Sequence, residues 1–176
     1  MQVDKLEAHY EMLKRWNTKL NLTATLDIRK HFGESLFLGS VMAGFTEGSA
    51  TVADIGSGGG FPGMPLAILR PEWQVTLVES DHRKSIFLRE CAGLAPNVRV
   101  LTDRAENLAG HFDWVVSRAV TPEFVAEVAL RHGERVGMIL REAPQVAGIT
   151  NEVAQDLPWT GTGVVWIGRV EPSAQG

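Results

Sequence analysis

The chain has 176 residues, 44% of them apolar, enough for one domain with its own hydrophobic core. Its formal net charge of −4 provides no global positive field for nucleic acid, so any RNA contact must rest on a local basic patch. The single cysteine, Cys91, excludes an internal disulfide and fits a reducing compartment. No apolar run is long enough to cross a bilayer and no signal-peptide pattern is present. We therefore expect a cytoplasmic monomer without a membrane or metal partner.

Residues 4–20 have the pattern of an amphipathic helix. Apolar side chains recur along it at spacings of three and four, which places them in one stripe that we expect to dock on the rest of the domain: Leu6, Tyr10, Leu13, Trp16 and Leu20. Lys14, Arg15 and Lys19 near its end either complement the helix dipole or contact an RNA backbone. A second helix is expected over residues 27–42.

Residues 51–63 are predicted to form a strand, a glycine loop and the start of a helix. Thr51–Ile55 is a mostly apolar run bounded by turn residues, and five glycines follow between positions 56 and 63. Pro62 suits the first turn of a helix that continues toward Pro71. Glycine lets a backbone approach a ligand closely, and the N–H groups of such a loop and helix start favour negative ligand groups.

Three interpretations of this loop compete. The pattern G-x-G-x-x-G at 58–63 formally matches a dinucleotide fingerprint. However, the strand ends at Ile55, and when the pattern is counted from Gly56 its third glycine position holds Phe61. The pattern D-x-G-x-G-x-G at 54–60 resembles instead the first motif of class I methyltransferases, which bind S-adenosylmethionine (SAM). The third interpretation is a tight turn without a ligand.

A carboxylate follows the next predicted strand. Apolar and polar side chains alternate over residues 73–78, which predicts a strand that ends at Glu79. This residue lies a little over twenty positions after the first loop glycine. Doubly wound folds place an acidic ribose ligand at about that offset, so we predict that Glu79 binds the ribose hydroxyls of a nucleoside. The alternative ribose ligand is Asp81, which is otherwise the N-cap of a helix over 83–92.

The rest of the chain continues this alternation. The expected elements are strands at 97–101, 114–116, 136–140 and 163–170, a helix at 122–131 and a short helix around 151–156. Strands alternating with helices predict an α/β fold with a doubly wound, mostly parallel sheet. We expect a single domain over 1–176, in which a helical extension, 1–45, packs on a SAM-binding core, 50–170.

Ligands of doubly wound sheets bind at the carboxyl ends of the strands. The turn at 102–106 follows the third expected strand at that edge, so it could form a wall for adenine. Arg118 follows the fourth expected strand at the same edge, either as a site residue or as a surface charge.

Several stretches between residues 10 and 120 together resemble the RsmG family, also called GidB. Members of this family are SAM-dependent enzymes that methylate N7 of a guanine in the 16S ribosomal RNA of the small subunit. The matching stretches are W-N at 16–17, N-L-T at 21–23, His31 with Ser35–Leu36, D-I-G-S-G-G-G-F-P-G at 54–63, Arg83–Lys84 with Phe87–Leu88, R-A-E at 104–106 and S-R-A at 117–119.

The resemblance implies a class I methyltransferase fold, SAM as cofactor, and ribosomal RNA or the small ribosomal subunit as partner. The resemblance implies SAM contacts by Gly56 and Phe61 at the loop and by the backbone of Ala105 and Glu106 at the adenosine end. It also implies that Arg118 closes the site. The catalytic residues are unknown, with Arg118 and His31 as candidates for positioning the guanine or its phosphate. Because guanine N7 already offers a lone pair, no general base is required.

The chain also departs from the family pattern. Arg141–Glu142 stand where the family tends to have Lys-Gly, and the short segment 145–162 predicts an incomplete last pair of strands. These departures concern substrate recognition and leave SAM binding intact. Three alternatives stay open: a methyltransferase of another RNA or a small molecule, a non-catalytic SAM-binding relative, and a nicotinamide dehydrogenase, which Phe61 and Pro62 make the weakest.

Overall fold

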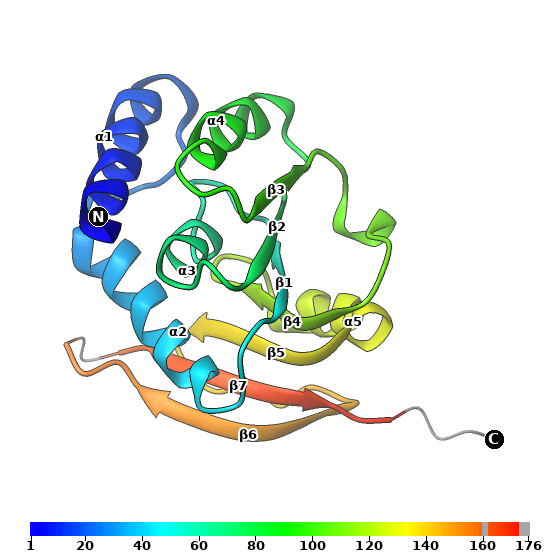
Figure 1. The fold of residues 1–176 in the computed structure, drawn as a ribbon. Helices are drawn as coiled ribbons and strands as arrows, with labels where there is room; N and C mark the ends of the chain where they lie inside the picture. The colour runs from blue at the N-terminus through cyan, green and yellow to red at the C-terminus, as the bar shows by residue number, and fades with distance from the viewer. Residues whose placement is uncertain (160–161, 173–176) are drawn as a thin grey trace.

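The computed structural model describes residues 1–159 and 162–172, and its centre is a seven-stranded sheet in the order β3-β2-β1-β4-β5-β7-β6 (Figure 1). The strands are β1 (Thr51–Ile55), β2 (Gln74–Val78), β3 (Val98–Leu101), β4 (Phe112–Ser117), β5 (Gly133–Leu140), β6 (Ile149–Asp156) and β7 (Val164–Val170). Strands β1 to β5 pair in parallel, and β7 runs antiparallel to both β5 and β6. The prediction of a doubly wound, mostly parallel sheet is confirmed.

Helices cover both faces of the sheet. They are α1 (Gln2–Leu20), α2 (Glu34–Ala43), α3 (Gly63–Leu69), α4 (His82–Ala92) and α5 (Pro122–His132), with a π-helical turn at Arg29–Gly33 and a 3-10 turn at Ala105–Asn107. Residues of α1 to α4 pack in one core and residues of α5 in the other. The central strands are nearly continuous apolar runs because both of their faces are covered.

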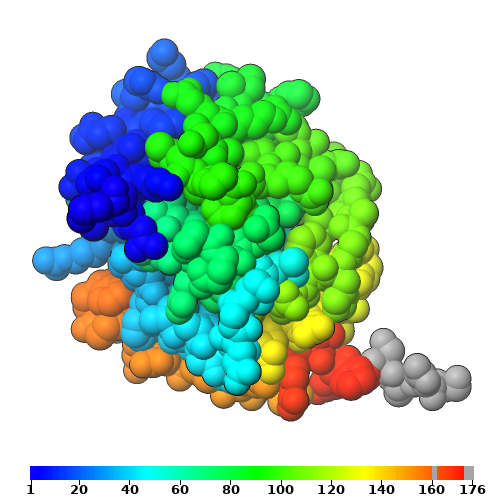
Figure 2. All heavy atoms as spheres, in the orientation of Figure 1, coloured from blue at the N-terminus to red at the C-terminus, as the bar shows by residue number. Residues whose placement is uncertain are grey.

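The N-terminal helix docks through its apolar stripe, as predicted. Leu13 is fully buried, and the other stripe residues are partly buried against the core. Helix α1 contacts α3 and α4, and in the space-filling view its residues lie directly against those of α4 (Figure 2). The side chain of Asn17 then bonds both the N–H and the C=O of Thr23, at 2.9 and 3.1 Å, which fixes the turn that follows the helix.

The C-terminal region differs from the prediction. The short helix expected around 151–156 is wrong, because these residues form strand β6, and the last pair of strands is complete. Strand β7 is rich in Val, Ile and Trp, and pairing with β6 satisfies backbone groups that would otherwise stand at an open edge. This tertiary pairing overrides the helical preference of Glu, Ala and Gln in β6.

No helix in the described ranges has both the length and the apolar character needed to cross a membrane.

Candidate functional site

A cavity of about 360 Å³ opens at the carboxyl edge of the sheet, where doubly wound folds bind their ligands. It is lined by Ile55, Gly56, Val78, Ser80, residues 103–106, Val120 and Phe124. Three of the predicted SAM contacts, Gly56, Ala105 and Glu106, therefore lie together on its wall. The turn at 102–106 approaches the glycine loop because parallel strands bring both of their carboxyl ends to one edge.

Glycine is required at several loop positions by backbone conformation. Gly56, Gly58 and Gly60 have φ values of 69°, 53° and 86°, in the left-handed region that glycine adopts without strain. A Cβ at Gly56 would also lie 2.7 Å from a methyl carbon of Val120. The loop therefore runs close to the cavity wall only because its residues have no side chains.

The N–H groups of this loop are bonded within the protein. Val78 O accepts from Gly56 and Ser57 at 3.0 and 3.1 Å, and Ser57 O accepts from Gly60 and Phe61 at 2.7 and 3.2 Å. Side-chain carboxylates accept from two further loop residues. Most of the loop's N–H groups therefore already have acceptors, which reduces its capacity to bind a negative ligand. The expectation that they favour such a ligand stays a prediction.

Asp54 holds the start of helix α3 from below the loop. Its Oδ2 accepts from the N–H of Gly63 at 3.0 Å, and its Oδ1 has no hydrogen-bond partner among the described residues. The side chain is completely buried, and this burial raises the pKa of Asp54 to about 7. The sequence analysis used Asp54 only as part of a motif. The available signal was an acidic residue in an otherwise apolar strand.

Glu79, which follows β2, forms a hydrogen bond to the glycine loop. Its Oε2 accepts from the N–H of Gly58 at 2.9 Å and its Oε1 from the N–H of Asp81 at 2.8 Å. Asp81 in turn caps α4, accepting from the N–H groups of Arg83 and Lys84 at 2.8 and 3.0 Å. Asp81 is therefore an N-cap, and the ribose role of Glu79 stays a prediction.

Phe61 is buried and does not line the cavity. Its ring is 3% exposed and stacks on the imidazoles of His9 and His31, with centroids 4.9 and 4.7 Å away. Phe32 meets it edge-on at 5.1 Å. The ring thus joins the glycine loop to the N-terminal helices. Its predicted contact with SAM remains a prediction.

His31 also binds within the protein. Its Nε2 donates to the backbone carbonyl of Thr25 at 2.6 Å. The same nitrogen lies 3.2 Å from the hydroxyl oxygen of Thr23. Burial lowers the pKa of the imidazole, so the ring is neutral near pH 7. In this arrangement His31 fastens the turn after α1 against Phe61, and its predicted role in positioning a substrate is untested.

Arg118 extends from the end of β4 toward the start of α2. Its Nη1 donates to the carbonyl of Lys30 at 3.0 Å and lies 3.8 Å from the carboxylate of Glu34. The guanidinium stands 5.1 Å from the centre of the Phe61 ring, a cation–π contact. The structure thus places Arg118 against the N-terminal helices, and the cavity described above does not include it.

His9 is a further residue of the site that no sequence motif marks. Its Nε2 bonds the carbonyl oxygen of Gly59 at 2.9 Å, and the residue is completely buried. The only signal was a histidine next to the apolar stripe of an amphipathic helix. In the described part of the chain, no three His, Cys, Asp or Glu residues are grouped so that they could hold a metal ion.

The sequence matches the model of a known family. The family model described as "GidB: rRNA small subunit methyltransferase G" matches residues 2–141. The relative from Neisseria gonorrhoeae (strain FA 1090), named ribosomal RNA small subunit methyltransferase G, is 42% identical over 120 residues, which is 66% of this chain and 58% of the relative. The relative of the same name from Roseiflexus sp. (strain RS-1) is 37% identical over 167 residues, 88% of this chain and 69% of the relative. The chain thus spans a little over half of the Neisseria relative's length.

Solved structures show the same fold at low sequence identity. A 1,6-didemethyltoxoflavin N1-methyltransferase from Burkholderia thailandensis, solved with S-adenosylhomocysteine, superimposes with a TM-score of 0.62 at 14% identity, covering 83% of this chain and 82% of that one. Precorrin-6y C5,15-methyltransferase from Geobacter metallireducens gives a TM-score of 0.57 at 12% identity, with 78% and 87% covered. The fold is that of class I methyltransferases, and the chain belongs to the rRNA small subunit methyltransferase G (GidB) family.

Proposed function

We propose that the chain binds SAM and transfers its methyl group to N7 of a guanine in 16S ribosomal RNA. Membership of the GidB family supports this reaction. The observation that carries the choice of cofactor is the bonding of the glycine loop, in which the N–H groups of residues 56, 57, 58, 60, 61 and 63 already have protein acceptors.

A dinucleotide places its pyrophosphate on free N–H groups at the start of a helix. Here Asp54 Oδ2 takes the N–H of Gly63, the first residue of α3, and Glu79 takes the N–H of Gly58. The two amides at these positions are therefore already bonded, which disfavours a phosphate ligand. SAM carries a sulfonium cation and no phosphate.

The cavity residues would hold the adenosine part of SAM. The backbones of Gly56, Ala105 and Glu106 line the cavity, and Glu79 adjoins it between Val78 and Ser80. When bound, SAM supplies an electrophilic methyl group. The protein's contribution is then to orient guanine N7 and to exclude water. Orientation alone lowers the activation barrier by several kcal/mol, because well-oriented reactants react as if one were present at about 10⁵ M or more.

RNA contact is assigned to exposed basic residues around the N-terminal helices. Lys14 pairs with Glu11 and Arg15 with Glu90, whereas Lys19, Arg29 and Lys30 are among the exposed cations of this region that are available to phosphates. Replacing Arg29 and Lys30 with Ala should flatten the salt dependence of subunit binding by about one to two units of slope. Unchanged affinity for SAM is the control, and an unaltered salt slope moves the RNA interface elsewhere.

Ligand binding is tested first. Thermal unfolding and calorimetry with SAM, S-adenosylhomocysteine and NAD should show binding and stabilisation by the first two only. Stabilisation by NAD alone would refute the methyltransferase assignment. We propose further that the protein acts as a monomer in the cytoplasm. A sedimentation measurement at working concentration tests the monomer, since a dimer would contradict it.

Methyl transfer is tested second. Labelled SAM is incubated with small ribosomal subunits from a strain that lacks the modification, and with naked 16S RNA. Label at a guanine N7 supports the proposed reaction, whereas label in another RNA supports the alternative substrate. SAM binding without transfer to either substrate would favour a non-catalytic relative.

A further inference from the structure

His9 is a buried polar group that the proposed reaction leaves unexplained. It stands on α1, fifty residues before the glycine loop, and is completely buried. Its ring stacks on Phe61 at 4.9 Å and meets Phe32 edge-on at 5.6 Å. An apolar side chain would suffice to fill this space, whereas the imidazole places Nε2 2.9 Å from Gly59 O.

The bond from His9 fixes the orientation of one peptide group. The peptide between Gly59 and Gly60 has its C=O against His9 Nε2 and its N–H bonded to Ser57 O at 2.7 Å. Both ends of this peptide are therefore held. Gly60 has a φ of 86°, and a Cβ there would lie 3.0 Å from His9 Nε2, so α1 closely approaches the loop backbone at this point.

Carbonyl oxygens only accept, so His9 Nε2 must carry the hydrogen. His9 Nδ1 is buried without a partner among the described residues, and a proton there would be a buried donor with no acceptor. The imidazole is thus the neutral Nε2–H tautomer. It donates one hydrogen bond, and that bond is directed at the glycine loop.

We infer that His9 is a positioning residue, which holds the Gly59–Gly60 peptide of the glycine loop in the orientation needed to bind SAM. This role rests on the proposed SAM binding and adds a requirement to it: the loop takes its working shape only when α1 is docked. The N-terminal helix is then part of the cofactor site, although none of its residues lines the cavity.

Two variants of His9 separate hydrogen bonding from packing. Leucine in His9→Leu fills similar volume without a donor, and glutamine in His9→Gln carries an amide N–H that can take the place of Nε2–H. Tyr10→Phe is the matched control, because it removes a hydrogen bond from α1 to the carbonyl of Leu26 and leaves the glycine loop untouched. S-adenosylhomocysteine affinity is measured by calorimetry at a temperature where all four proteins are folded.

We expect His9→Leu to weaken S-adenosylhomocysteine binding about tenfold, and His9→Gln to restore it to within about threefold of the wild type. Tyr10→Phe should bind as the wild type does. Equal losses of affinity in His9→Leu and His9→Gln would mean that His9 acts through packing and not through its hydrogen bond. Wild-type affinity in His9→Leu would refute the inference. Failure of the wild type itself to bind would count against the proposed function instead.

Amide exchange supplies a readout that needs no ligand. In the free protein, the Gly60 N–H should lose protection in His9→Leu and keep it in His9→Gln and Tyr10→Phe. Nitrogen NMR should also report the Nε2–H tautomer of His9 in the wild type. Unchanged protection of Gly60 in His9→Leu would overturn the positioning role whatever the cofactor is.

Discussion

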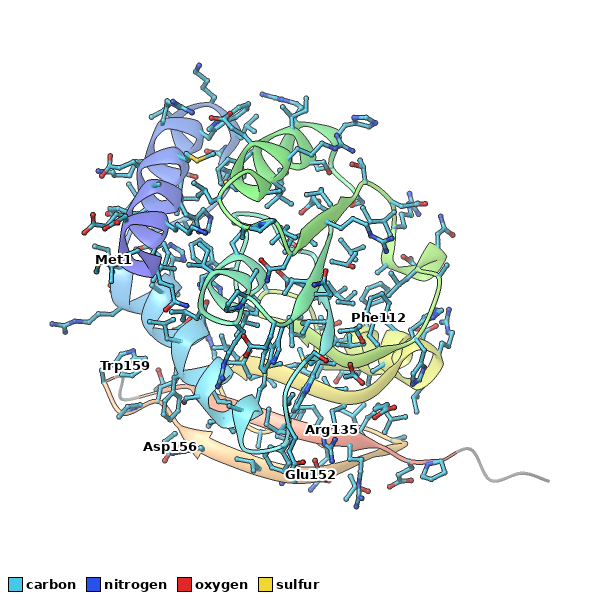
Figure 3. The ribbon with its side chains drawn as sticks, in the orientation of Figure 1. Met1, Phe112, Arg135, Glu152, Asp156 and Trp159 are labelled. Atoms are coloured by element: carbon cyan, nitrogen blue, oxygen red, sulfur yellow. The ribbon has the colours of Figure 1, made fainter. Side chains whose placement is uncertain are left out.

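The glycine loop and the β6–β7 hairpin are stabilised in opposite ways. Buried side chains from three separate parts of the chain bond the loop's backbone: His9, Asp54 and Glu79. In the hairpin, backbone pairing supplies most of the contacts. Glu152 of β6 adds ion pairs to Arg169 of β7 and to Arg135 of the neighbouring β5, and Arg135 and Glu152 lie near each other in Figure 3. The loop therefore has a shape that single side chains specify, whereas the hairpin has one that many equivalent contacts share. Substitutions should reveal this difference.

The largest expected effect concerns Asp54 and pH. Its pKa of about 7 in the folded state lies above its value of 3.8 in an unfolded chain, so the folded protein keeps a proton that the unfolded chain releases. The resulting stabilisation is complete below about pH 4 and is lost as the pH rises through 7. One pKa unit corresponds to about 1.4 kcal/mol, so the change is on the order of 4 kcal/mol.

Denaturant unfolding of the wild type and Asp54→Asn from pH 4 to 8 measures this effect. The wild type should lose stability relative to the variant across that range. The comparison is needed because burial lowers the pKa of His9 to about 4. Protonation of His9 therefore makes the stability of both proteins rise with pH between about 4 and 6.5, opposite to the effect of Asp54. Parallel curves would mean that Asp54 titrates normally.

The next effect is steric. A Cβ at Gly63 would lie 2.3 Å from Leu77 Cδ2 and 2.6 Å from Asp54 Oδ2, so Gly63→Ala should lower the free energy of unfolding by about 3 kcal/mol. Gly93→Ala is the control, because Gly93 has a φ of −60° at the end of α4 and its nearest contact would be 3.3 Å. The melting temperatures of the two variants test this prediction, and equal melting temperatures would contradict the close packing around Gly63.

Removal of Glu79 should act mainly on the ligand. Glu79→Ala takes acceptors from the N–H groups of Gly58 and Asp81 and removes the predicted ribose ligand, so S-adenosylhomocysteine affinity should fall by about 2 kcal/mol. Calorimetry measures it, with Glu72→Ala, which breaks an exposed pair with Arg70, as control. If the two variants bind alike, Glu79 has no role in binding.

The smallest effects are expected for the two arginines that pair with Glu152 of the hairpin. Arg169 is 60% exposed in its pair with Glu152, so Arg169→Ala should cost less than about 1 kcal/mol of stability. Arg135 is less exposed and also lies over the rings of Phe45 and Trp114, so Arg135→Ala should cost more. Neither should alter ligand affinity. A loss of affinity in either variant would remove the contrast between the two regions.

Much of the fold was predictable because it depends on local pattern. Apolar patterns located α1 and the parallel strands, and an N-cap was one of the two interpretations of Asp81. Strand β6 was not predictable, because its residues favour a helix and only the presence of β7 makes them a strand. Prediction of the candidate site was likewise partial. The turn at 102–106 follows from the strand edges and the contacts Gly56, Ala105 and Glu106 from the family resemblance, whereas His9 approaches the loop only through tertiary packing.

The carboxylate of Asp54 beneath helix α3 bears on competition in the cell. Cells contain nucleotides such as ATP and NAD at high concentration, and a glycine loop with free amides at a helix start would attract all of them. Here the protein's own carboxylate permanently occupies the first amide of the helix. A phosphate would have to displace a buried group and stand beside another acid, Glu79. We therefore expect the site to bind such competitors weakly because of a group that does not line the cavity.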